Sequence, residues 1–288
     1  MIPRGTITRR IVRRTAISWL VLSPLLVLAL LPFAVMLSTA LKPLPEVTAF
    51  PPRWLPSRLA WQNFVDMWAT VDFGTGLANS LFISLTATLL TILVSVPAGY
   101  AVSRLPFRGV GAYRQFLLVT KMLSPILLVL GLFRMAASIH IGDGTLVDTR
   151  IIVVVIYATF NIAFAVWMLA AYFATIPIEL EEAAWIDGAN RLQSVVRIFL
   201  PLSLPAIAVT GIVTFVGSWN EFVVALTMLR DPSRLTLPLK VVNLVAGRYT
   251  VEWNQVMAAT LLATLPVAVV FAALQRYLVQ GLTLGAVK

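Results

Sequence analysis

The chain of 288 residues contains no cysteine and a single histidine, His140. Disulfide frameworks, thiol catalysis and zinc sites built from histidine and cysteine are therefore excluded. No glycine precedes a lysine, so the glycine-rich phosphate loop of many ATPases is absent. No nucleophile, base and metal ligands gather at one depth of the apolar segments, which argues against a membrane enzyme. We expect no catalytic residue, metal site or cofactor in this chain.

Charged residues are scarce as well, at 12%, whereas 59% of the residues are hydrophobic. This balance is far from that of a soluble domain and indicates a polytopic membrane protein. The formal net charge of +10 could suggest nucleic acid as a partner. However, the basic residues cluster at the ends of apolar segments, where the membrane surface and the insertion machinery recognise them. We therefore expect membrane lipid, and no nucleic acid, among the partners.

Six apolar segments are long enough to cross the hydrocarbon core of about 30 Å as helices. Several arginines precede the first segment, which is too long for a signal peptide and has no cleavage site after it. We interpret it as a retained anchor with the N-terminus in the cytoplasm, and six spans then place the C-terminus there too. We expect an all-α membrane protein with one transmembrane domain over residues 1–288. The predicted spans are residues 17–39, 79–102, 115–136, 151–174, 204–229 and 256–275.

Charges inside these segments need partners, because a charge at the bilayer centre costs about 2.5–3.5 kcal/mol. Lys121 and Arg134 lie near enough to the ends of the third segment to extend towards the membrane surface. Glu221 follows Trp219 and Asn220 in the fifth segment, so we expect this trio to face an aqueous path or a partner helix.

Other polar residues lie on helical faces of the predicted spans. Tyr157 and Asn161 are four residues apart, so they share a face and are candidates for contact with a polar solute. Ser84 and Thr88 belong to a row of hydroxyl residues on one face of the second segment. The alternative for both sets is a buried contact between helices with mutually satisfied hydrogen bonds. The complete row is Ser80, Ser84, Thr88, Thr91 and Ser95.

Residues 176–203, which we name the coupling elbow, are too polar to lie in the membrane. Pro177 begins a predicted helix over residues 178–189, with glutamates in the first turn, where acids suit the helix dipole. Gly188 ends or turns that helix, and a second helix runs from about Arg191 to the Leu200–Pro201 break. We expect an elbow of two helices across the inner membrane face, presenting small and apolar residues to another protein.

The spacing within the elbow resembles that of a known motif. Glu182-Ala183-Ala184, Gly188 after three residues, and Ile198 with Leu200-Pro201 after nine more resemble the EAA loop of permease subunits in binding-protein-dependent ABC importers. The similarity is closest to the MalG-like sugar permeases. It extends to Asn79-Ser80, to Trp219-Asn220-Glu221-Phe222 and to the tail Gly281–Lys288.

The resemblance implies a type I ABC importer permease fold with cytoplasmic coupling helices, in a bacterial plasma (inner) membrane. It implies a homologous second permease subunit, two ATP-binding cassette subunits that bind ATP and Mg, and an external solute-binding protein that delivers a sugar or sugar-like solute. Glu182 would pair with basic residues of the ATPase, and Gly285 and Lys288 would lie in a C-terminal tail that reaches the ATPases. The coupling residues implied are Glu182, Ala183, Ala184, Asp187, Gly188, Leu200 and Pro201.

Two alternatives remain at this stage. An ATP-independent secondary transporter would more often carry ionisable residues near the middle of several spans, and few are present here. Another kind of polytopic membrane protein would leave the EAA-like spacing without an explanation. The sequence does not distinguish a sugar from a polyol or a sugar phosphodiester as the solute.

Overall fold

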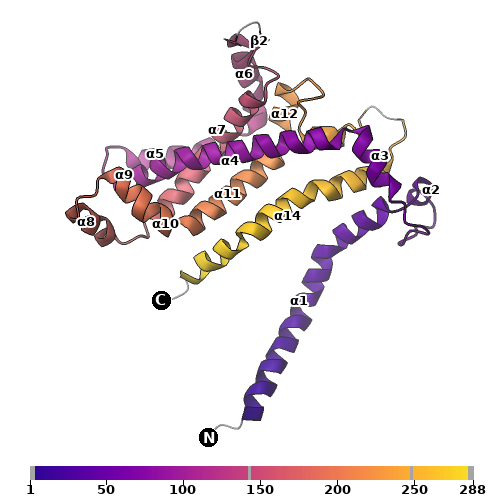
Figure 1. The fold of residues 1–288 in the computed structure, drawn as a ribbon, viewed down its shortest axis with the longest axis horizontal. Helices are drawn as coiled ribbons and strands as arrows, with labels where there is room; N and C mark the ends of the chain where they lie inside the picture. Colours follow the sequence, from indigo (N-terminus) through magenta and orange to yellow (C-terminus); the bar gives the residue numbers. More distant parts are fainter. Residues whose placement is uncertain (1–3, 142–143, 247–248, 285–288) are drawn as a thin grey trace. The chain divides into compact units, whose positions relative to one another are not determined.

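The computed structural model describes residues 4–141, 144–246 and 249–284. These residues are mostly helical, as the sequence predicts, with irregular segments between the helices (Figure 1). The exception is one antiparallel pair of two-residue strands, β1 His140–Ile141 and β2 Gly144–Thr145. The chain divides into two compact units. One comprises Met1–Val71 with Leu244–Leu262, and the other Asp72–Asn243 with Ala263–Lys288.

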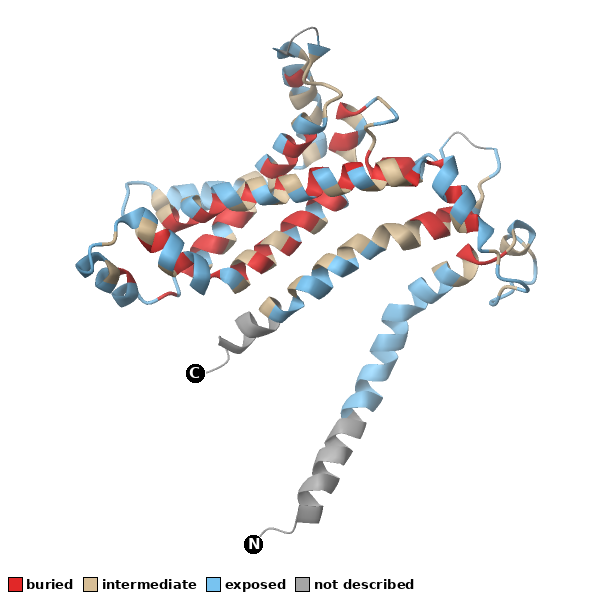
Figure 2. Ribbon diagram, in the orientation of Figure 1, coloured by how far each residue is buried: buried red, intermediate tan, exposed pale blue. Residues whose placement is uncertain are grey.

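The first unit contains α1 Arg4–Ala40, α2 Leu44–Val47, α3 Gln62–Thr70 and the beginning of α14 Trp253–Leu284. Most of the candidate span within α1 is exposed, and its apolar side chains require lipid or a partner protein as their environment (Figure 2).

A buried asparagine fixes the helix ends of this unit. The amide of Asn63 donates to the carbonyl oxygens of Ala40 at 2.7 Å and Lys42 at 2.9 Å. Its own oxygen accepts a hydrogen bond from Asn254 at 2.9 Å. These hydrogen bonds join the end of α1, the start of α3 and the start of α14.

The second unit contains the remaining elements. It consists of α4 Phe73–Arg104, α5 Val110–Met122, α6 Pro125–Ser138, α7 Arg150–Phe173, α8 Ile178–Ile186, α9 Arg191–Ser194, a π-helical turn Val195–Phe199, α10 Leu200–Leu202, α11 Leu204–Trp219, α12 Val223–Met228, α13 Leu237–Val242 and the rest of α14. Long helices α4 and α7 pack side by side, and α8, α9 and α10 gather at one end of them (Figure 1).

The contact between α4 and α7 is close because Gly99 has no side chain. A Cβ atom at position 99 would lie 3.1 Å from Cβ of Leu169 and 3.3 Å from the backbone nitrogen of Ala170. Few real contacts are that short, so the two helices approach each other only with glycine here. The buried side chains Val166 and Phe173 lie on the same helix as Leu169 and continue the core around this contact.

Among the described residues, four helices are long and apolar enough to cross a membrane: Ser18–Ala40, Phe73–Arg104, Arg150–Phe173 and Trp253–Tyr277. Two bent pairs raise the total to six if each pair counts as one span. The all-α membrane fold is therefore confirmed, with four to six candidate spans in the described residues.

Two predicted spans are interrupted in the structure, and only the first interruption coincides with a bent pair; the second bent pair joins Arg191–Leu202 to Leu204–Trp219. The predicted span 115–136 bends by 92° between α5 and α6, at the residues before Pro125. A residue that precedes proline is disfavoured in helical conformation, which explains the position of the bend. The predicted span 204–229 ends its first helix at Trp219 and resumes as the short helix α12.

Candidate functional site

The coupling elbow forms as two helical arms joined at Gly188. The first arm, α8, ends at Ile186, slightly earlier than the predicted 189. Gly188 has a φ of +84°, and no atom lies within 4 Å of where its Cβ would be, so the backbone conformation and not space requires glycine. The second arm starts at Asn190, whose side chain and that of Gln193 cap each other's backbone N–H groups at 2.9 and 2.8 Å.

The second arm continues further than the sequence predicts. The chain runs through Pro201 in helical conformation, and the bend of 78° falls at Ser203, between α10 and α11. Proline is tolerated there because it occupies the first turn of α10. The predicted break at Leu200–Pro201 is therefore displaced by two to three residues.

Most of the residues that the EAA-like motif singles out are exposed on this elbow. Exposed side chains are available to a partner, and Trp185 and Ile186 add apolar surface beside them, with Ile186 86% exposed. Glu182, Ala183, Asp187, Gly188, Leu200 and Pro201 are exposed and Ala184 is half-buried. Gly285 and Lys288 of the predicted tail contact lie outside the described residues.

Glu181 is buried, although the sequence counted it only as one of the acids in the first turn of α8. Its side chain is 2% exposed and accepts a hydrogen bond from the Tyr100 hydroxyl. The Nε atom of Arg104 lies 3.8 Å from Glu181 Oε2, which makes a buried ion pair. Both partners belong to the last two turns of α4, so α8 is attached to that helix.

Arg104 connects this ion pair to the end of α7. Its guanidinium donates to the carbonyl oxygens of Phe173, at 2.8 Å, and Ile176. The same group lies 5.1 Å from the ring centroid of Phe199, which also meets the ring of Tyr100 edge-on at 5.1 Å. Glu181, Tyr100, Arg104 and Phe199, hereafter the Glu181 cluster, thus join α4, α7, α8 and the π-helical turn.

Glu221, which the sequence left facing either a path or a partner, finds its partner inside the chain. Its carboxylate accepts hydrogen bonds from the backbone N–H groups of Val224, at 3.0 and 3.1 Å, and Ala225, at 3.3 Å. The charge therefore caps the N-terminus of α12, where the helix dipole favours an anion. The hydroxyl of Tyr157 donates to the carbonyl oxygen of Glu221 at 3.3 Å.

The other candidates for a solute path divide into two groups. Tyr157, Trp219 and Ser84 are buried in the described structure, whereas Asn220 is exposed. Asn161 is half-buried and donates to the Tyr157 carbonyl at 2.8 Å and to the Ser218 hydroxyl at 3.3 Å.

Two of the five hydroxyls in the row on α4 bond within the helix, and the buried Ser95 hydroxyl has no hydrogen-bond partner in the described structure. Thr88, half-buried, donates to the Ser84 carbonyl at 2.7 Å, and Thr91 donates to Ala87 at 2.7 Å. Ser80 instead accepts the backbone N–H of Leu237 at 2.7 Å, so it holds an outer segment of the chain. Solute contact by Ser84 and Thr88 stays a prediction.

Lys121 points onto the middle of α7 and not towards a helix end. Its ammonium donates to the carbonyl oxygen of Phe160 at 3.5 Å and lies 5.9 Å from the Phe164 ring centroid. Phe160 is about 15 Å along α7 from Arg150, at 1.5 Å per residue. Lys121 therefore holds its charge at mid-depth, where an aqueous path or a partner group is required.

Charged residues outside the spans hold the segment 229–236, which we call the outer loop because the predicted topology places it on the outer side. Asp148 accepts the backbone N–H groups of Arg230 at 2.9 Å and Asp231 at 3.1 Å, and it pairs with Arg234 at 3.3 Å. Hydrogen bonds from Ser233 lower the pKa of the Asp231 carboxyl. These contacts give structural roles to Arg230, Asp231 and Arg234, for which the sequence offered no pattern.

A second ion pair fixes α13, which follows the outer loop, to the start of α4. The Lys240 ammonium lies 2.7 Å from the Asp72 carboxylate, and its hydrogen bond lowers the pKa of that carboxyl. The lysine reaches Asp72 because Gly76 leaves room: a Cβ there would lie 2.8 Å from Lys240 Cδ.

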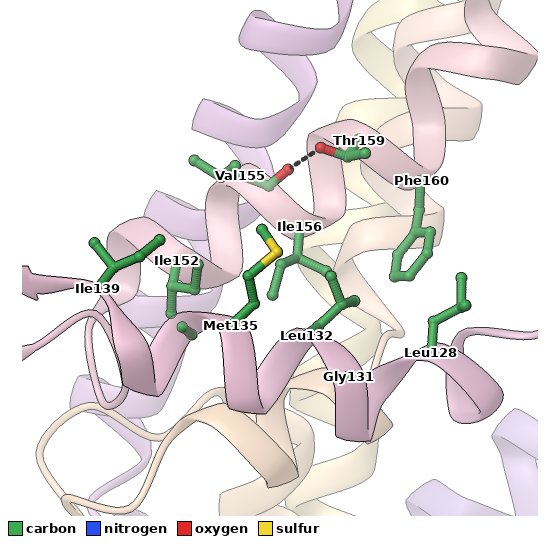
Figure 3. A pocket seen from close by; sticks show the side chains of 11 residues that line it. Leu128, Gly131, Leu132, Met135, Ile139, Ile152, Val155, Ile156, Thr159 and Phe160 are labelled. Atoms are coloured by element: carbon green, nitrogen blue, oxygen red, sulfur yellow. Dashed lines mark hydrogen bonds between the residues drawn. The ribbon is translucent and has the colours of Figure 1, made fainter.

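A cavity of about 420 Å³ lies between α6 and α7 (Figure 3). Its lining is apolar except for Thr159, whose hydroxyl donates to the Val155 carbonyl at 2.8 Å within the same helix. A sugar requires several unsatisfied polar groups, and this cavity offers none among its lining residues. We therefore do not assign the solute to it.

A multi-span helical membrane protein with a surface-exposed helical elbow is the class that this fold and site define. The chain belongs to the family described as the binding-protein-dependent transport system inner membrane component, which matches residues 95–284. That range contains the whole coupling elbow.

Curated relatives extend the similarity over most of the chain. It is 34% identical over 265 residues to the inner membrane ABC transporter permease protein YcjP of Escherichia coli K12, covering 91% of this chain and 92% of that protein. It is 35% identical over 219 residues to the trehalose/maltose transport system permease protein MalG of Thermococcus litoralis, covering 76% and 77%. The trehalose transport system permease protein SugB of Mycobacterium tuberculosis is 32% identical over 277 residues, covering 96% and 98%.

A solved structure shows the same fold. A chain of a bacterial ABC transporter involved in the import of the acidic polysaccharide alginate superposes with a TM-score of 0.75, covering 96% of this chain and 99% of that chain at 21% identity. The expected type I importer permease fold is thus confirmed, together with the resemblance to carbohydrate ABC permeases.

Proposed function

We propose that this protein is the permease subunit of an ATP-driven importer and forms half of the path for a sugar or sugar-like solute. The coupling elbow is the observation that carries the proposal. Glu182 lies exposed on it, and within the described part of the chain no ion pair holds this carboxylate. Relatives named for trehalose, maltose and diacetylchitobiose transport support a carbohydrate as the solute.

ATP hydrolysis then belongs to partner subunits, and this chain is not itself an enzyme. Two ATP-binding cassette subunits bind ATP and Mg and engage the elbow through Glu182, Ala183, Asp187 and Gly188. Closure of the ATPase pair moves the elbows of two homologous permeases and exposes the central path alternately to the two sides. The N- and C-termini lie in the cytoplasm in this arrangement, as the arginines before the candidate span Ser18–Ala40 favour.

The solute path is assigned to the polar break between α11 and α12. Asn220 is exposed there, Asn161 and Thr88 are half-buried, and Lys121 holds a charge at mid-depth on a neighbouring face. A solute-binding protein delivers the cargo from outside. A solved relative of the fold, an alginate transporter, is in complex with a periplasmic protein bound to an alginate pentasaccharide, which supports such a partner.

Co-purification and uptake test the proposal. The tagged full-length chain, extracted in mild detergent, should carry an ATPase of similar stoichiometry, and the reconstituted complex should take up solute with ATP. Glu182→Lys should uncouple uptake from hydrolysis, whereas Asp66→Lys, the same charge reversal at an exposed site on α3, should not. Reproducible absence of an ATPase, with solute uptake intact, would instead identify an ATP-independent transporter.

The cargo is identified through the cognate binding protein. Sugars, polyols and sugar phosphodiesters are added separately, and the solute that raises its melting temperature is the ligand. The same solute should then stimulate ATP hydrolysis by the complete complex.

A further inference from the structure

Two neighbouring glutamates of α8 face in opposite directions. Successive residues of an α-helix are rotated by about 100°, so adjacent side chains need not share an environment. Glu182 is exposed, whereas Glu181 is 2% exposed. One acid is therefore available to a partner and the other is sealed inside the protein.

Glu181 is the only buried residue of α8, all of whose residues are described. The apolar residues of the helix do not anchor it, since Ile178, Leu180 and Ile186 are 50%, 45% and 86% exposed. Apolar burial normally fixes a surface helix to its core. In α8 a single buried carboxylate takes the place of this apolar anchor.

The residues that bind the Glu181 carboxylate lie at the end of α4, and one of them also contacts the end of α7. Tyr100 and Arg104 lie in the last turns of α4, and Arg104 also binds the carbonyl oxygens of Phe173 and Ile176 at the end of α7. A displacement of α8 that separated Glu181 from these partners would leave the buried Arg104 guanidinium without its counter-charge, which is strongly unfavourable. Movement of α8 is therefore transmitted to α4 and α7 together.

We propose that Glu181 is a positioning residue for energy coupling: it transmits movement imposed on the exposed face of α8 to the inner ends of α4 and α7. The inference rests on the proposed function, because it requires an ATPase to act on the elbow. Glu182 makes the outward contact, and Glu181 makes the inward one.

Matched substitutions of the two acids separate these roles. Glu182→Gln weakens binding of the ATPase, measured as its dissociation from the complex. Glu181→Gln keeps the side-chain shape and removes the charge that faces Arg104. It leaves ATPase binding unchanged and lowers the solute taken up per ATP hydrolysed in proteoliposomes by about tenfold, within the range of measured coupling effects. A purely structural loss would lower the amount of complex and leave this ratio unchanged.

A second variant guards against misfolding of Glu181→Gln. Tyr100→Phe removes only the hydroxyl that donates to Glu181 and keeps the ring against Phe199, so it should lower the ratio in the same direction by a smaller factor. Amide hydrogen exchange of residues 178–186 in the full-length chain in lipid nanodiscs should be faster in both variants, and unchanged in Glu182→Gln.

The outcomes separate the inference from the proposed function. Unchanged exchange of α8 in Glu181→Gln, or faster exchange with a normal uptake-to-hydrolysis ratio, overturns the inference. If the proposed function is wrong, the wild-type complex itself shows no ATP-driven uptake. A lowered ratio with normal ATPase binding in Glu181→Gln supports the assignment.

Discussion

Replacing Gly99 by alanine should destabilise the membrane domain through the contact between α4 and α7. The new Cβ would lie 3.1 Å from Cβ of Leu169, 3.3 Å from the backbone nitrogen of Ala170 and 3.3 Å from Cε2 of Phe173. None of these atoms ends a flexible side chain that could turn away. The two helices must therefore separate by a few tenths of an ångström along a buried seam.

The size of the effect follows from two opposing contributions. Overpacking a well-packed core typically costs about 1–3 kcal/mol. Replacing glycine by alanine inside a helix returns up to about 1 kcal/mol through better helix propensity. We expect a net loss of about 1–2 kcal/mol for Gly99→Ala, and a larger loss for Gly99→Val because its methyl groups extend further into α7.

Unfolding in sodium dodecyl sulfate, followed by tryptophan fluorescence, measures the difference in unfolding free energy. Gly211→Ala is the matched control, because the nearest atom to a Cβ there is Thr88 Cγ2 at 4.0 Å, an ordinary contact. It should be neutral or slightly stabilising. Equal stability of the Gly99→Ala and Gly211→Ala variants would refute the close-packing argument.

Three further predictions concern the polar contacts outside the coupling elbow. Asn63→Leu leaves two carbonyl oxygens at the end of α1 unpaired and should cost about 1–3 kcal/mol in the same unfolding assay. Asp148→Ala frees two backbone N–H groups of the outer loop and removes one ion pair of Arg234, and trypsin should cleave that loop faster. The Asp72 pKa is lowered by the hydrogen bond from Lys240, so the stabilisation of α13 is present above the unfolded carboxyl pKa of about 3.9 and is lost as the pH falls through the lower folded value. A nitroxide at Asn243, which caps α13, should become more mobile over that acidic range.

Each of these has a control. Gln62→Leu, at an exposed neighbour of Asn63, should leave unfolding unchanged, and an equal loss in both variants would contradict the role of the Asn63 amide. Asp148→Asn retains an acceptor oxygen and tolerates the positive φ of 62° at this position, so it should protect the outer loop better than alanine does. Asp72→Asn should abolish the pH dependence, and a titration that survives this substitution would assign it to another group.

Much of the fold could be predicted from the sequence because lipid imposes simple rules. A span needs a long apolar stretch, and the segments before Arg104 and Phe173 satisfy that requirement over their whole length. The elbow could be predicted from helix-terminal chemistry, since Pro177 and Gly188 carry their conformational preferences wherever they occur. The bend at Pro125 follows from the same local steric rule.

The partners of buried polar groups could not be predicted in the same way. Glu181 and Glu182 are chemically identical, and only the rotation of α8 against Tyr100 and Arg104 decides which acid is buried. One signal was available: a tyrosine and an arginine four residues apart at the end of an apolar span form a polar face that needs an acceptor. Glu221 differs, because the N–H groups that it binds lie only three and four residues further along the chain. The break between α11 and α12 that exposes those N–H groups is not visible in the hydropathy of the sequence.

By itself the sequence determined that this chain resides in lipid, spans the membrane about six times and presents an EAA-like elbow, because hydropathy, charge position and residue spacing are properties of short segments. Tertiary structure alone decided which residue of the elbow faces outward and which is anchored, that Glu221 caps a helix, and that Asp148 and Lys240 hold outer segments. Those outcomes depend on atoms brought together from residues as far apart as Asp72 and Lys240, and no local pattern encodes a contact of that kind.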